Sequence, residues 1–286
     1  MGVHLGDKAI GVGFVTEKEV PKIKFGAGID NIIGNIDANG MLSKSTEEFD
    51  FVFDGVKTFG SGALYNKFRS LINLRNVYMP DCTAWSGNQV VREAFSDSSI
   101  KGLYCPKLQT ITGSAMAYVI CGRTQLEHLD LAALKTVTGA ISMGSAFQQT
   151  KLTKVHFYSL TRADANSFAY TGSTNGIFQG CTLLTEIHFR MDVQAVIEKM
   201  QNYGNKWGAT NATIYFDLVG TITVDGVEYA RKELDTIRVD WERVWVAWED
   251  ASGNIIYTSA SDEPAVGTAV YSDAGITQVG TVSGVA

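Results

Sequence analysis

The chain has 286 residues, of which 45% are hydrophobic and 19% are charged, and its formal net charge is −6. This is enough apolar sequence for a sizeable core, and the mild acidity argues against nucleic-acid binding, which needs a basic surface. No run of about 18 apolar residues occurs, so no membrane insertion is expected.

Residues 1–47 are predicted to form an N-terminal β cap, which is also a candidate for attachment to a larger assembly. Asn39-Gly40, between Ile36 and Leu42, is typical of a β-hairpin turn. The stretch from Met1 to Phe25 is interrupted by charged residues and contains no apolar signal-peptide core. A secreted protein would need such a segment, so export through a signal peptide is not expected.

Residues 48–190 carry an internal period of 26 residues. The pattern Leu-x-x-Φ-x-Φ, where Φ is apolar, recurs every 26 residues and then once after 32, beginning at Leu74, Ile100, Leu126, Leu152 and Leu184. A second array keeps the same register, at Val56, Cys82, Leu108, Leu134 and Leu160. A fixed period of this length indicates a solenoid, because one repeat alone is too short to bury its apolar face.

Each repeat is predicted to contribute two short strands, which stack in parallel on those of the next repeat about 4.8 Å away. The Φ-x-Φ alternation has the period of a strand, and phrases such as Thr136-Val137-Thr138-Gly139 alternate again before a turn. The inward columns would be Phe51, Val77, Leu103, Leu129, Val155, Ile187 and Phe53, Met79, Cys105, Leu131, Phe157, Phe189. The predicted fold class is a mainly β repeat solenoid with short turns, flanked by small β modules and one capping helix.

The repeats resemble the BspA-like leucine-rich repeats of bacterial surface antigens. In residues 176–189 a Phe, a Cys and a Leu-x-x-Ile strand follow one another in the order typical of that family. The resemblance covers residues 48–190 and departs from the pattern at Ala132 and Tyr158, which stand where the family has proline, and at Cys121, which stands where it has phenylalanine. It implies a leucine-rich-repeat-like fold and a role in binding or adhesion, and it implies no reaction.

Side chains between the inward columns should point away from the core, because side chains alternate along a strand. The aromatic, imidazole and carboxylate groups expected on this outer face are Tyr78, Tyr104, His128, Asp130, His156, Tyr158 and His188. Such groups suit contact with sugars or protein loops. An ordinary solvated sheet face, on which Tyr and His occur through β propensity alone, is the alternative interpretation. A metal site at Asp130, His156 and His188 is a third interpretation, and no metal is predicted.

The four cysteines all fall at core positions of the repeats, and no CxxC or paired spacing is present. Cys82, Cys105, Cys121 and Cys181 are therefore predicted to be buried free thiols rather than disulfides or metal ligands.

Residues 191–240 are predicted to contain a capping helix and a β-hairpin. Val193, Val196, Ile197 and Met200 follow helical spacing, so residues 192–203 should form an amphipathic helix over the last coil. A strand at 214–216 and a hairpin about the turn at 225–226 follow.

Residues 241–286 are predicted to form a small C-terminal β module. Trp241, Trp245 and Trp248 are interpreted as its core, with an exposed sugar platform as the alternative. Residues 263–282 contain a Pro-x-Val-Gly-x-x-Val-Tyr phrase followed by Gly-Thr-Val, and they resemble the ends of tail-fibre-like virion proteins of gut bacteriophages.

No P-loop, dinucleotide fingerprint, HExxH or GxSxG motif occurs, so no enzyme activity and no cofactor are predicted. The hypothesis is a bacteriophage virion protein, such as a tail fibre, baseplate or receptor-binding component. Its partners would be other virion proteins, a host-surface glycan or protein, and further copies of itself. A bacterial cell-surface adhesin and a carbohydrate-active enzyme on a repeat scaffold are the alternatives.

Overall fold

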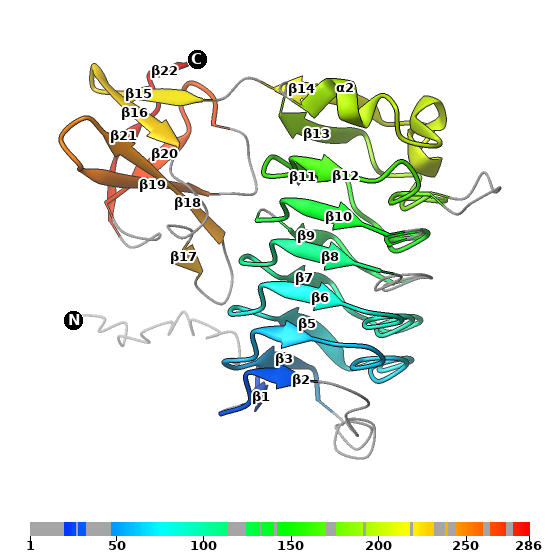
Figure 1. Ribbon diagram of the computed structural model, residues 1–286. Helices are drawn as coiled ribbons and strands as arrows, with labels where there is room; N and C mark the ends of the chain where they lie inside the picture. Colours follow the sequence, from blue (N-terminus) through cyan, green and yellow to red (C-terminus); the bar gives the residue numbers. More distant parts are fainter. Residues whose placement is uncertain are drawn as a thin grey trace, which may run out of the picture.

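The computed structural model describes residues 20–26, 28–32, 47–113, 124–131, 133–139, 142–169, 176–190, 193–217, 220–231, 238–239, 244–259, 264–272 and 277–286. Most of them form a β-solenoid of about 6 turns, whose parallel strands recur about 26 residues apart. A small all-β module stands beside the solenoid (Figure 1). The predicted fold class is confirmed.

The first sheet of the solenoid contains one strand from each of the first five coils. Its parallel strands, in spatial order, are β1 (Lys22–Phe25), β3 (Phe49–Phe53), β5 (Leu74–Tyr78), β7 (Gly102–Tyr104) and β9 (His128–Asp130). In the later coils a separate parallel sheet holds β11 (Lys154–Phe157), β13 (Glu186–Arg190) and β14 (Thr213–Asp217). Val77 pairs with Leu103 and Leu103 with Leu129, so the sequence period sets the register.

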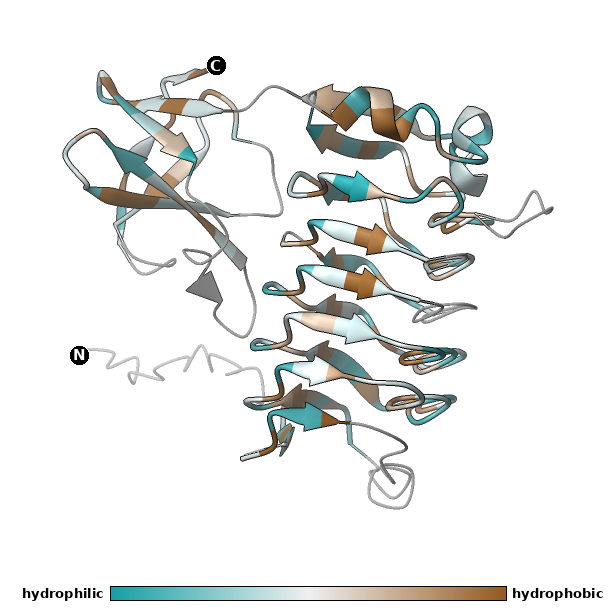
Figure 2. Ribbon diagram, viewed as in Figure 1, coloured by the Kyte–Doolittle hydropathy of each residue, from teal (hydrophilic) through white to brown (hydrophobic). Residues whose placement is uncertain are grey.

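The second sheet lies across the core from the first and is also parallel. Its strands are β2 (Asn31–Ile32), β4 (Thr58–Phe59), β6 (Ala84–Ser86), β8 (Thr110–Thr112), β10 (Thr136–Thr138) and β12 (Arg162–Ala163). Ile111 and Val137 pair with each other and are both buried, while the flanking threonines are half-exposed. Figure 2 shows this alternation as one hydrophobic residue between paler ones on β8 and β10.

The turn-rich connections after the second-sheet strands also stack on one another. The backbone amides of Gly62, Leu64 and Phe68 donate to the carbonyls of residues 88, 90 and 94 in the next coil, at 3.0, 2.7 and 2.8 Å. No strand is predicted here from the sequence, but these hydrogen bonds satisfy the backbone groups in the same way as a sheet does. Adjacent coils are therefore hydrogen-bonded on three sides.

The core of the solenoid is built from the predicted columns. Leu74, Ile100, Leu126, Leu152 and Leu184 all have 0% exposure. Cys82, Cys105 and Cys181 are buried free thiols, as predicted, whereas Cys121 lies outside the described residues. Burial raises the pKa of the Cys82 thiol to about 12, so this sulfur stays protonated and is a packing group.

The solenoid extends beyond both predicted boundaries. At its start, Ile23 and Phe25 of β1 pair with Phe51 and Phe53, so residues 22–32 form a coil of their own. The hairpin predicted at Asn39-Gly40 lies outside the described residues. At its end, β14 pairs in parallel with β13, so the ladder does not stop at Phe189 as the predicted boundary implied.

The predicted capping helix is much shorter than residues 192–203. It consists of α2 (Gln194–Ile197), followed after a turn by the 3₁₀ helix η2 (Tyr203–Gly208). Asn202, the residue before η2, has φ of +64°, a left-handed conformation that separates η2 from the preceding turn, and Val193 supplies no side-chain cap to α2. Ile197 and Trp207 are nevertheless buried in the solenoid core. No helix in the described ranges is long and apolar enough to cross a membrane.

The rest of the chain forms an antiparallel barrel with its own core. Its strands are β15 (Thr221–Val224), β16 (Val227–Arg231), β17 (Arg238–Val239), β18 (Val244–Asp250), β19 (Ile255–Ser259), β20 (Ala269–Tyr271), β21 (Gln278–Thr281) and β22 (Gly284–Val285). β21 pairs with β20 and the adjoining β22 pairs with β15, which closes the sheet. The predicted hairpin about Asp225-Gly226 is present, with positive φ at both residues.

The module boundaries therefore differ from those predicted at residues 190 and 240. Residues 193–217 belong to the solenoid, and β15–β16 belong to the barrel with the C-terminal strands. Trp248 is fully buried in the barrel core, and Trp245 is 1% exposed against the ring of Tyr271, whereas Trp241 lies outside the described residues. The two described tryptophans pack as core residues and do not form an exposed platform.

Candidate functional site

The predicted outer-face residues lie on β5, β7, β9, β11 and β13, or directly after β11, but they are not equally accessible. His128 is exposed, and Tyr104, Asp130 and His156 are half-buried. Tyr78, Tyr158 and His188 are only 2%, 5% and 9% exposed. The expectation of an open face is thus wrong for these three, because their rings pack against neighbouring side chains and, for Tyr158, against the barrel.

Tyr78 and Tyr104 form the first ring pair on this face. They are register partners on β5 and β7, and their rings stack with centroids 4.8 Å apart and planes at 9°. The Tyr104 ring lies over Gly102, where a Cβ would come within 2.4 Å of Tyr104 Cε2. The absence of a side chain at Gly102 therefore allows the ring to lie flat along the sheet.

A second ring cluster covers β11, β13 and β14. His156 stacks on His188 at 4.7 Å, and His188 stacks on Tyr215 at 4.8 Å, because the three are register partners on successive strands. The ring of Tyr158 lies 5.0 Å from that of His156. The sequence analysis missed Tyr215, although the Φ-x-Φ pattern of Ile214 and Phe216 places it in the same outward column.

Charged groups surround the second cluster. Glu186 accepts hydrogen bonds from Lys154 at 2.9 Å and from His188 Nε2 at 3.0 Å, and these bonds, Lys154 first, lower the pKa of its carboxyl group. Burial is the main cause that lowers the pKa of His156 to about 3, and the electrostatic effects of His188 and Lys154 contribute to the same shift. The His156 ring is therefore neutral at pH 7.

The geometry does not favour the metal interpretation. The rings of His156 and His188 are stacked with planes at 23°, so their faces rather than their nitrogen lone pairs meet. Within the part of the chain that the structure describes, no three His, Cys, Asp or Glu side chains are placed to share an ion. The cluster is built as a packed ring surface, which suits contact with a partner more than coordination chemistry.

A buried carboxylate, Asp50, lies at the start of the same face and was not singled out from the sequence. Its side chain is 0% exposed and accepts two hydrogen bonds from Arg75, both at 2.9 Å, and one from Asn76 at 3.1 Å. Asp50 raises the pKa of the Arg75 guanidinium through these bonds. Because all partners come from the next strand, this group fastens two coils together.

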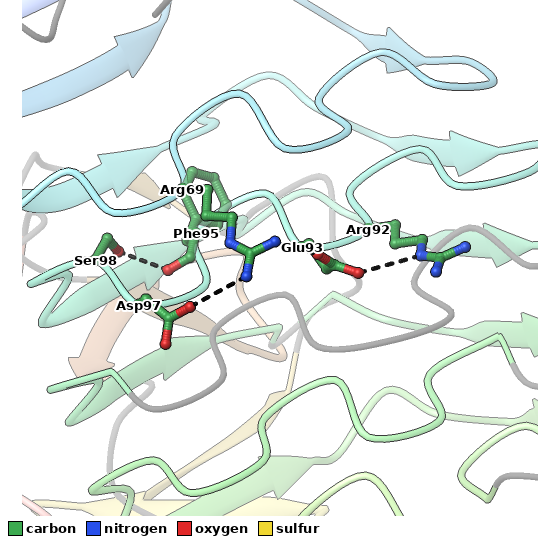
Figure 3. A network of polar contacts seen from close by, with 6 residues as sticks. All are labelled: Arg69, Arg92, Glu93, Phe95, Asp97 and Ser98. Carbon is green, nitrogen blue, oxygen red and sulfur yellow. Dashed lines mark hydrogen bonds and ion pairs between the residues drawn. The ribbon is translucent and has the colours of Figure 1, made fainter.

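A polar network on the turn-rich edge also fastens coils (Figure 3). Arg69 forms ion pairs with Glu93 at 2.8 Å and Asp97 at 3.5 Å in the following coil, and Arg92 lies 3.5 Å from Glu93. These side chains are partly exposed, so each pair contributes little to stability.

Comparison with known proteins adds no assignment, since no protein-family model, no curated protein and no solved structure matches this chain.

Proposed function

We propose that the chain is a non-enzymatic adhesion or structural component of a bacteriophage particle, such as a tail fibre, baseplate part or receptor-binding protein. The observation that carries the proposal is the rigid solenoid with stacked aromatic and imidazole rings on one face. A rod of this kind holds side chains in fixed positions, which lowers the entropic cost of binding. The phage-like phrase in residues 263–282, which contributes β20 and β21 of the barrel, supports a virion origin.

In this proposal the solenoid contacts a glycan or protein of the host surface, and a terminal part joins other virion proteins. Several copies per particle would convert weak contacts into strong attachment. The accessible part of the outer face includes His128, the half-buried Tyr104 and Tyr215, whose side chain is 41% exposed. These residues are the proposed contact points, whereas Tyr78 and Tyr158 are buried and are not expected to touch the ligand.

The test is binding of the labelled chain to a panel of intact bacterial cells, together with its copy number in purified particles. Combining His128→Ala with Tyr215→Ala should abolish cell binding. Ile72→Ala, at a residue 73% exposed on the turn-rich edge, should leave cell binding unchanged. Binding that survives the double substitution, or absence of the chain from particles, would overturn the proposal.

A bacterial cell-surface adhesin is the second candidate, and the resemblance of residues 176–189 to BspA-like repeats favours it. The two candidates differ in location. Antibody against the chain should label phage particles in the first case and the bacterial envelope in the second.

A further inference from the structure

The cationic side chain of Arg231, at the end of β16, joins the barrel to the solenoid. Its guanidinium carbon lies 5.2 Å from the ring centroid of Tyr158 on the solenoid and 5.8 Å from that of Trp248 in the barrel. A guanidinium over two aromatic faces is attracted to both, more strongly when water is excluded. Because Tyr158 is only 5% exposed, this contact is largely dry.

His156 lies directly beside this contact and is poorly solvated. Its ring stacks on that of His188 and is tilted by 41° against that of Tyr158. Neither Nδ1 nor Nε2 has a hydrogen-bond partner among the described residues, although both atoms are buried. A buried polar atom without a partner lowers the stability of the state that buries it, and a buried unpaired charge lowers it far more. The docked arrangement therefore tolerates the neutral ring and disfavours the protonated one.

The charges around His156 offer little compensation for a proton. The titratable or charged groups on the elements around it are Asp130, Lys154, Tyr158, Glu186, His188, Tyr215 and Arg231. Glu186 is the anion that acts to raise the His156 pKa, and it is already bonded to Lys154 and His188. Lys154, His188 and, from the barrel, Arg231 act in the opposite direction. Asp130 occupies the preceding position of the column, on β9.

We propose that the barrel is an acid-releasable cover on this part of the outer face, and that protonation of His156 detaches it from the solenoid. A positive imidazole beside Arg231 opposes the contact, and separation lets water reach both groups. Release would uncover Tyr158 and the ring stack of His156 and His188. The inference concerns the chain alone and holds whatever the ligand is.

The direction with pH follows from the depressed pKa of His156. The ring titrates near 6.5 when solvated and at about 3 when docked, so acid favours the detached state between these values. Between these two pH values, the ratio of detached to docked molecules should rise about tenfold for each unit by which the pH falls. Above pH 6.5 the ring is neutral in both states, and docking should not depend on this group.

Small-angle X-ray scattering of the full chain, from about pH 8 to about pH 4, tests the proposal in the range where histidines titrate. The radius of gyration should increase on acidification, while far-UV circular dichroism stays unchanged. The variants His156→Phe and His156→Gln carry no titratable ring. Whichever of the two variants folds should keep a constant radius of gyration over the same pH range. His128→Phe, on the same face but exposed, should behave as the unsubstituted chain.

Three results would overturn the proposal. The first is a radius of gyration that does not change with pH. The second is expansion of the His156 variants at the same pH as the unsubstituted chain. The third is loss of β-sheet signal together with expansion, because acid would then unfold the solenoid rather than release the barrel.

Discussion

Individual buried polar groups help to stabilise the packing of adjacent coils. Asp50 is fully buried, and its carboxylate accepts hydrogen bonds from Arg75 and Asn76 of the next strand. Removing it by Asp50→Ala leaves Arg75 without this partner in a setting where its side chain is 32% exposed. We expect a loss of about 2–3 kcal/mol in the free energy of unfolding, measured by urea titration.

The matched control is Asp30→Ala. Asp30 also pairs with a cation, Lys57 at 3.0 Å, but the two side chains are 65% and 60% exposed. The free energy of unfolding should therefore change by less than about 1 kcal/mol. If the two variants lost the same free energy of unfolding, the burial of Asp50 would add nothing to the stabilisation by its ion pair.

At the scale of the element, the corner after each second-sheet strand requires close approach of backbones. Gly113 has φ of +72°, and a Cβ there would lie 2.8 Å from the carbonyl oxygen of Gly87 in the preceding coil. Gly113→Ala should therefore destabilise through strained φ and through separation of the coils, by about 2–4 kcal/mol in total. Thermal or urea unfolding measures the change.

Gly62 separates these two effects. Its φ is +71°, but a Cβ would meet nothing within 4 Å. Gly62→Ala should therefore show only the backbone term, about 1 kcal/mol. The prediction for Gly113 fails if the two alanine variants lose equal stability.

Strands and helix differ in how well the sequence predicts them. The strands of the coils are determined by period-two alternation repeated in register, and their predicted inward residues are buried, except Leu129, which is partly buried. The length of the helix is not determined in this way. The spacing of Val193, Ile197 and Met200 indicates which residues are buried, but it does not require one continuous helix. A left-handed Asn202 and the turn before it place the same residues inward with only one helical turn.

At the scale of the whole molecule, coils of equal length should behave as separable units. Deleting residues 100–125, which is one 26-residue period, joins Ser99 to Leu126 and keeps every column in register. We expect this variant to retain its β-sheet circular dichroism and a cooperative unfolding transition. The docking of Arg231 on Tyr158 should also persist, since both lie after the deletion.

Deleting only residues 100–112 provides the contrast. That half-period brings second-sheet positions opposite first-sheet positions, so apolar and polar columns no longer align. The variant should aggregate or lack a cooperative transition. If it unfolds like the one-period deletion, the stacking of equal coils is not what stabilises the chain.

The sequence by itself determined the solenoid, the inward columns, the buried cysteines and the barrel hairpin, because each depends on local alternation, period or turn chemistry. Only the tertiary structure decided where the solenoid ends and which outward residues are accessible. A pattern distinguishes the two faces of a strand, but it does not show what covers the outer one. Arg231 covers Tyr158 from 73 residues further along the chain, and such a contact leaves no periodic trace in the sequence.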